Sequence, residues 1–332
     1  MKLVYTIAFL LITACILTHS QLGIGYSLLG LNLWFEKMIP ALFPFMILSG
    51  IMIRMRLTEN FSKLLYPVIR PVYKVSRNAC YAMIMGFFCG FPMGAKTIAD
   101  LLKRNMLSVQ EAEFLLSFCN NIGPVYFCGF VLPLLGRKLL LPYVFGMYGI
   151  PLTYGFLLRK TLYRHLNLSA ANIQNVAITE APPSLQDAAS TSGFGHSVKV
   201  SAPQNLLYEI DDAVNSSIQS ILSLGGYMIL FNLLNLPFHI ICGKTPVFLA
   251  PLLEITGGLK LSAAASASSG RILYMLLLLP FGGLSCIAQT NSCIKGTGLS
   301  LTAYTLHKTV LTILTGLYYL LWFLLSPSSF LR

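Results

Sequence analysis

The sequence predicts an all-α polytopic membrane protein, and its composition and the spacing of its charges are the observations that predict it. Of the 332 residues, 55% are hydrophobic and only 10% are charged, against roughly 25% charged residues in an average soluble domain. Stretches without any charge cover residues 3–35, 38–53, 78–95, 114–136, 139–158, 213–243, 272–294 and 309–331. Several can hold a membrane-spanning helix of about 20 apolar residues, whereas others are too short or are broken by Gly and Pro. The composition therefore excludes a soluble enzyme, a disordered chain and a nucleic-acid binder.

The net charge of +12 arises from 23 Lys and Arg residues against 11 Asp and Glu residues. In a chain this apolar, basic residues mark the cytoplasmic ends of spans and contacts with anionic lipid head groups. We therefore expect the lipid bilayer as a partner and no nucleic acid.

Residues 1–35 are predicted to form an N-terminal transmembrane or interfacial segment. Leu3–Thr18 follows Lys2 and could be a signal peptide. The stretch 12–15 also looks like a lipoprotein cleavage box. Because more apolar residues follow Cys15 and no exported soluble domain comes after it, we expect a first span that is retained.

A polar linker is predicted at 165–208, between a first repeat at 36–164 and a second repeat at 209–332. The linker region is rich in Ser, Ala, Asn and Pro and lacks the apolar periodicity of a helix, as exposed segments do. The basic residues around Arg159 favour a cytoplasmic location for it, although they leave the topology open.

The two halves of the chain share short motifs in the same order, which predicts an internal repeat. The matching stretches are 64–70 with 248–254, 86–97 with 281–290, and the Leu-Ser steps at 107–108 and 299–300.

Two of these motifs carry Gly-rich tips within apolar stretches, where water cannot satisfy the backbone. Non-helical backbone at membrane depth is tolerated only when it is buried in protein or lines a wet cavity. We therefore interpret 81–102 and 273–294 as re-entrant helical hairpins, with a kinked ordinary span as the alternative. Polar residues close to the tips favour hairpins, because such residues are costly when they face lipid. The candidate binding residues are Gly90, Pro92, Gly94, Lys96 and Thr97 in the first hairpin and Gln289, Thr290 and Asn291 in the second.

A broken helix follows the first hairpin. Ser108 and Glu111 fit a capping box, which predicts a helix that starts there and runs into Asn120-Asn121-Ile122-Gly123-Pro124. Pro124 has no N–H and its ring obstructs the preceding turn, so the helix should open. Asn120, Asn121 and Gly123 are therefore candidate ligand contacts. The alternative is that the Asn side chains bond across to another helix.

A second broken segment, Pro251–Gly258, carries a lone carboxylate, Glu254, close to Thr256. Glu254 could form a structural salt bridge with Lys96 or Arg70, coordinate a coupling cation, or carry a proton. Both Glu254 and Thr256 are candidate binding residues.

No motif for enzymatic chemistry is visible. The eight cysteines lie in apolar segments without a CxxC pair or zinc-ligand spacing, and no phosphate loop, GxSxG or HExxH is present. We predict that the protein is not an enzyme and uses no metal or cofactor beyond a coupling cation or proton.

From Gly90 to Thr97 and from Ser117 to Pro124 the sequence resembles the sporulation integral membrane proteins often labelled YlbJ, which include stage V sporulation protein V. These proteins belong to the nucleoside-recognition (Gate) group. Leu253–Gly258 supports the resemblance, which covers roughly residues 39–325 apart from the linker.

The resemblance implies a fold like the transport core of concentrative nucleoside transporters, with two inverted repeats that each carry a re-entrant hairpin and a broken transmembrane helix. It also implies a place in the outer forespore membrane and the movement of dipicolinic acid during spore formation, whereas the Gate label suggests nucleosides. The second predicted hairpin departs from the first, because 282–286 lacks its Pro and Lys. The two halves should therefore not be equivalent in binding.

The leading hypothesis is a transporter that binds dipicolinic acid, a small anionic solute, between the two tips and the opened helix. A planar dianion needs positive potential, which Lys96 and the N-terminal ends of half-helices can supply. The alternatives are a nucleoside or nucleobase permease coupled to a cation through Glu254, and a non-transporting scaffold of the spore envelope. A homo-oligomer is compatible with all three.

Overall fold

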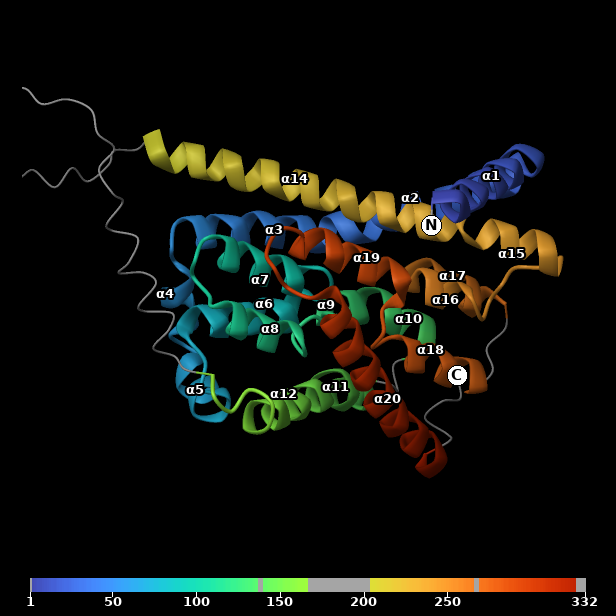
Figure 1. Cartoon of the computed structure of the whole chain (residues 1–332). Helices are drawn as coiled ribbons and strands as arrows, with labels where there is room; N and C mark the ends of the chain where they lie inside the picture. The colour runs from blue at the N-terminus through green and yellow to red at the C-terminus, as the bar shows by residue number, and fades with distance from the viewer. Residues whose placement is uncertain (1, 137–139, 167–203, 266–268, 327–332) are drawn as a thin grey trace, which may run out of the picture.

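The computed structural model describes residues 2–136, 140–166, 204–265 and 269–326. Within these ranges the chain is helical and contains no strand, so the predicted all-α fold is confirmed (Figure 1). The helices and π-helical turns (η) are, in chain order, α1 (Lys2–Thr18), α2 (Ser20–Leu33), η1 (Trp34–Met38), α3 (Ile39–Arg54), α4 (Thr58–Ser62), α5 (Tyr66–Tyr73), α6 (Arg77–Cys89), α7 (Met93–Lys103), α8 (Val109–Leu116), α9 (Pro124–Tyr126), η2 (Phe127–Val131), α10 (Leu132–Leu135), α11 (Leu140–Val144), η4 (Phe145–Gly149), α12 (Ile150–Lys160), α14 (Gln204–Leu233), α15 (Asn235–Cys242), α16 (Ala250–Leu253), α17 (Ile255–Ala264), α18 (Ser269–Leu278), α19 (Gly283–Ile294) and α20 (Leu301–Leu325).

Five helical stretches of the described chain are long and apolar enough to cross a membrane, which supports the predicted multi-pass membrane protein. They are Ser20–Arg54, Leu140–Lys160, Leu206–Cys242, Gly270–Ile294 and Leu301–Leu325.

The predicted segment boundaries only partly match these helices. η1 joins α2 and α3 into one helix, so the structure does not divide the chain after residue 35. The predicted linker at 165–208 lies mostly outside the described residues, which omit 167–203. Its last five residues already belong to α14.

The two halves pass through the same order of elements. Each has a long helix, two helices folded back on each other, an interrupted helix and a final long helix. In the first half these are α2–α3, α6 with α7, α8–α10 and α11–α12; in the second they are α14–α15, α16 with α17, α18–α19 and α20. We call the interruption at 117–123 the first break and the one at 279–282 the second break.

The α6–α7 hairpin turns where the sequence predicts it. α6 and α7 pack against each other, and the turn at 90–92 separates them. Gly90 adopts a φ of +82°, and a Cβ atom at this position would lie only 2.3 Å from the Gly123 nitrogen. A left-handed φ and this close approach both require glycine. The tip of the hairpin therefore packs backbone to backbone on the first break.

In the second half the structure differs from the prediction. The segment predicted to be a broken helix, Pro251–Gly258, lies in a hairpin, and the stretch predicted to be a hairpin, 273–294, is an interrupted helix. The chain reverses at Glu254, where α16 folds back on α17. A Cβ atom at Gly258 would lie 2.2 Å from the Pro251 nitrogen, and the Ser262 hydroxyl donates a 2.7 Å hydrogen bond to the Val247 carbonyl.

The predicted hairpin at 273–294 is instead an interrupted helix. α18 packs mainly against α20, whereas α19 packs against α14 and α7. A Gly-Gly step in an apolar stretch fits either a turn or an interruption, and only long-range packing decides between them. A Cβ atom at Gly283 would lie 3.1 Å from the Pro251 carbonyl oxygen, so the second break packs on the α16–α17 hairpin as the first break packs on the α6–α7 hairpin. Whether either hairpin is re-entrant in a bilayer stays a prediction.

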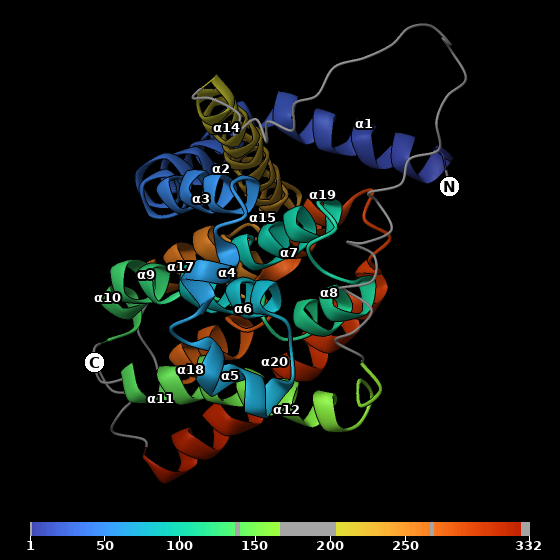
Figure 2. The ribbon, with the colours of Figure 1, turned by 90° about the vertical axis from the view of Figure 1, so that its left-hand side faces the viewer.

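Three layers hold these parts (Figures 1 and 2). α14 lies along α2 and α3 on one side, α11, α12 and the end of α20 lie on the other, and the hairpins and breaks lie between. Small residues bring α3 and α14 together, since a Cβ atom at Gly50 would lie 3.2 Å from Ala213 Cβ. The Trp34 indole N–H donates a 2.8 Å bond to the Ile221 carbonyl of α14.

Substitution of Gly90 tests the contact between the hairpin tip and the first break. We expect Gly90→Ala to destabilise the protein by about 2–5 kcal/mol, because it combines a left-handed φ with overpacking. Gly129→Ala is the matched control, since a Cβ atom there meets nothing within 4 Å. Melting of the purified protein in detergent measures both, and equal melting temperatures would contradict the contact.

Candidate functional site

A small central cavity lies where the hairpins and breaks of both halves meet. Its volume is about 50 Å³, which is room for a few water molecules and not for a ring-sized solute. Four predicted binding residues line it: Gly123, Glu254, Thr256 and Gln289. The other lining residues are Met38, Ala41, Leu42, Cys89, Phe91, Ile122, Val125, Tyr126, Leu224, Met228, Ile255 and Cys286.

The two halves touch each other around this cavity. A Cβ atom at Gly282 of the second break would lie 2.8 Å from the Phe91 ring at the tip of the α6–α7 hairpin. Between the helix that follows the first break and the α16–α17 hairpin, the Tyr126 hydroxyl of α9 donates a 3.2 Å bond to the Thr256 hydroxyl of α17. The cavity is thus lined by residues from both halves.

Asn120 braces the first break and does not line the cavity. Its amide donates bonds to the Thr290 hydroxyl at 3.1 Å and to the Tyr304 hydroxyl at 3.0 Å, and its side-chain oxygen accepts a 3.3 Å bond from the Ala95 N–H. These bonds tie α7, α19 and α20 to the break, and they match the alternative in which an Asn bonds across to other helices. The side chains of Asn120 and Thr290 are therefore buried and bonded to each other, and neither lines the cavity.

Sequence reasoning missed Lys308, which enters the same network. Lys308 is only 2% exposed. Its ammonium group donates to the Asn120 carbonyl at 2.5 Å and to the Asn121 side-chain oxygen at 3.1 Å. The Asn121 amide donates in turn to the Phe118 carbonyl at 2.6 Å. A charged residue inside the apolar helix α20 was the available signal, but Lys308 is also the last charge before the uncharged stretch that starts at 309.

Glu254 caps a helix. It is the N-terminal cap of α17 and is 2% exposed. Its carboxylate accepts bonds from the N–H groups of Thr256 at 2.9 Å and Gly257 at 2.6 Å, and from the Asn232 amide at 3.0 Å. Within the described chain it forms no ion pair with Lys96 or Arg70. The predicted salt bridge is therefore not found, and the carboxyl group caps α17 instead.

A larger polar cavity adjoins the central one. It has a volume of about 250 Å³, and Gln289 and Leu224 line both cavities. Two further predicted residues, Pro92 and Lys96, lie in its wall. Its remaining lining residues are Asp100, Lys103, Ser216, Gln219, Ser220, Ser223, Ser292 and Cys293.

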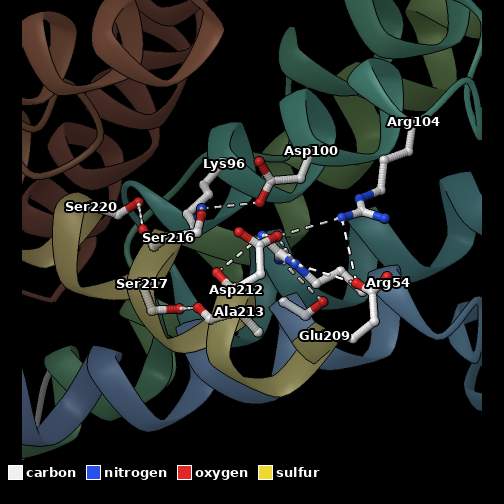
Figure 3. Close-up of polar contacts among 11 residues, drawn as sticks. Arg54, Lys96, Asp100, Arg104, Glu209, Asp212, Ala213, Ser216, Ser217 and Ser220 are labelled. Atoms are coloured by element: carbon white, nitrogen blue, oxygen red, sulfur yellow. Dashed lines mark hydrogen bonds and ion pairs between the residues drawn. The ribbon is translucent and has the colours of Figure 1, made fainter. Parts of the chain in front are cut away.

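Lys96 holds two partners in the polar cavity (Figure 3). Its ammonium group lies 3.0 Å from the Asp100 carboxylate and donates a 3.2 Å bond to the Ser216 hydroxyl of α14. Ser216, Ser220 and Ser223 belong to one face of α14, so this helix supplies a wall of hydroxyl groups that the sequence analysis did not assign to the site.

Ion pairs hold the N-terminal part of α14 beside this cavity (Figure 3). Arg54 at the end of α3 lies 2.7 Å from Asp212 and 3.8 Å from Glu209. Arg104, which follows α7, lies 3.9 Å from each of the same carboxylates. α14 is therefore anchored to both α3 and α7.

The remaining predicted binding residues lie outside both cavities. Gly94 is packed against the first break, where a Cβ atom would lie 2.9 Å from the Cys119 carbonyl oxygen. Thr97 is buried, and its hydroxyl has no hydrogen-bond partner among the described residues. Asn291 is exposed on α19. In the described ranges no three His, Cys, Asp or Glu side chains gather as metal ligands would.

Comparison with known proteins confirms the resemblance seen in the sequence. Residues 35–139 match the Gate family, described as nucleoside recognition. This match covers α3, the α6–α7 hairpin and the first break. The chain is also 28% identical, over 337 aligned positions that span 93% of it and 79% of the relative, to the sporulation integral membrane protein YlbJ of Bacillus subtilis strain 168. No solved structure matches the chain.

The capping role of Glu254 is testable by substitution with Gln. Glu254→Gln should lower the free energy of unfolding by about 1–2 kcal/mol, because the amide keeps one acceptor oxygen where the carboxyl group accepts three bonds through two oxygens. Glu59→Gln is the control: its exposed carboxylate lies 3.8 Å from Arg77, and such surface pairs contribute about 0–1 kcal/mol. Thermal unfolding in detergent gives the comparison, and a harmless Glu254→Gln would remove the capping role.

Proposed function

We propose that this protein is a transporter of a small planar dicarboxylate, that the solute is dipicolinic acid, and that it acts in the outer forespore membrane during spore formation. The membrane-spanning helices and the similarity to a sporulation integral membrane protein support a membrane role in sporulation. The observation that carries the proposal is the polar cavity, which places Lys96 and a row of serines beside the meeting point of the breaks.

The charge and chemistry of the polar cavity suit an anion. Lys96 and Lys103 are opposed by one carboxylate, Asp100, which leaves one positive charge. The hydroxyls of Ser216 and Ser223, which line the cavity, can donate to carboxylate oxygens, and bonds between an ammonium group and a carboxylate are the stronger kind. A volume of about 250 Å³ falls just below the range of roughly 300–1,000 Å³ for ligand pockets. This size favours a solute with a single ring.

Transport would require the solute to pass from the polar cavity toward the central cavity. Gln289 lines both, so it stands at the junction. The central cavity is too small for a ring in this state, and passage therefore needs the α6–α7 hairpin and the second break to separate.

The repeated order of elements supports the finer fold proposal. We take the two halves as inverted repeats with re-entrant hairpins, comparable to the core of concentrative nucleoside transporters. Solute sites in such transporters lie at the repeat interface, where helices are discontinuous.

A nucleoside permease is the second candidate, because the matched family is described as nucleoside recognition. A neutral nucleoside has less need of the positive charge at Lys96. Competition by uridine therefore distinguishes the two solutes.

Neutralisation of Lys96 tests the proposal. In proteoliposomes reconstituted with purified protein, Lys96→Met should lower dipicolinate flux at least about tenfold, because the charge-assisted bond between Lys96 and a carboxylate of the solute is lost. Lys96→Arg should retain part of the flux. Lys63→Met, at an exposed position outside both cavities, is the control, and melting temperatures verify that every variant is folded.

Two results would contradict the proposal. Unchanged dipicolinate flux in Lys96→Met would remove this residue from the path. Flux that uridine inhibits and dipicolinate does not would favour the nucleoside permease.

A further inference from the structure

Lys308 is a buried lysine with no carboxylate partner in the part of the chain that the structure describes. It lies in α20 and is 2% exposed, and within the described ranges it forms no ion pair. An isolated ammonium group in an apolar interior is costly unless polar groups compensate its charge. The groups around it therefore have to do so.

All three N–H donors of the ammonium group have an acceptor. Two are oxygens of the first break, the Asn120 carbonyl at 2.5 Å and the Asn121 side-chain oxygen at 3.1 Å. The third partner is the face of the Phe91 ring, whose centroid lies 4.3 Å away, within the range of a cation–π interaction.

The two oxygens belong to a type of site that binds cations in membrane proteins. The first break follows α8, and the C-terminal end of a helix carries partial negative charge. Unwound carbonyls at such ends coordinate Na⁺ in transporters with broken helices. Here the position is already occupied by a group with the charge of a monovalent cation.

We propose that the Lys308 ammonium group fills a monovalent-cation site in the first break, so that the chain itself supplies the positive charge that a bound cation would bring. The break then needs no bound cation to stay in its observed form. The charge is also fixed beside Phe91, which lines the central cavity. This inference does not depend on the identity of the solute.

Removal of the side chain should expose the site. We expect Lys308→Ala, purified in sodium chloride, to melt several degrees lower after exchange into choline chloride, and to recover when sodium chloride or methylammonium chloride is added. A ligand that binds only the folded state stabilises it more as its concentration rises, so the recovery should grow with the concentration of either salt. The wild-type protein and Lys63→Ala, a change at an exposed lysine, should melt at the same temperature in all three salts.

A second variant keeps the test decisive if Lys308→Ala does not survive purification. Lys308→Gln can still donate to the Asn120 carbonyl but brings no charge, and it should show the same dependence on sodium or methylammonium. The proposal is overturned if neither salt stabilises the variants more than choline does, if the wild-type protein gains as much, or if both variants fail to fold in sodium chloride. Because no solute is present, these outcomes leave the dipicolinate proposal untouched, and failure of dipicolinate transport leaves this one untouched.

Discussion

Backbone groups released from a helix inside a membrane must find partners within the protein, because lipid offers none. This constraint organises the centre of the molecule. At the first break the Asn120 carbonyl accepts from Lys308 and the Ile122 carbonyl accepts a 3.2 Å bond from the Tyr143 hydroxyl. At the α16–α17 turn the Glu254 carboxylate accepts the N–H groups of Thr256 and Gly257. At these two openings, freed backbone groups thus bond to side chains from elsewhere in the chain or to the cap of the helix itself.

Local chemistry could be predicted from the sequence, and long-range pairing could not. The opening before Pro124 and the turn at Gly90 follow from residues that lack an N–H or a Cβ atom, and both are where the sequence predicts them. Whether 273–294 forms a hairpin or an interrupted helix depends on which helices α18 and α19 contact. The periodicity of the sequence does not indicate these contacts. Lys308 and Asn120 are 188 positions apart in sequence, so their contact was likewise hidden.

The candidate site contains two kinds of residues: those that stabilise the breaks by hydrogen bonds, and those that line the cavities. The adjacent Asn side chains are the strongest polar signal in the sequence, yet they are consumed by contacts to Thr290, Tyr304 and Lys308. The walls of the polar cavity come instead from Lys96 and from serines of α14, which look unremarkable in a long apolar helix. Side chains with unusual chemistry therefore stabilise the interruptions, and ordinary hydroxyls line the space beside them.

One consequence of the shape of α14 concerns motion. This helix has 30 residues and is about 45 Å long at 1.5 Å per residue. Ser216 in the wall of the polar cavity and Asn232, which bonds to Glu254, lie on the same uninterrupted rod. Rotation or sliding of α14 must displace both residues together. The wall of the polar cavity and the cap of α17 therefore cannot rearrange independently unless α14 itself bends.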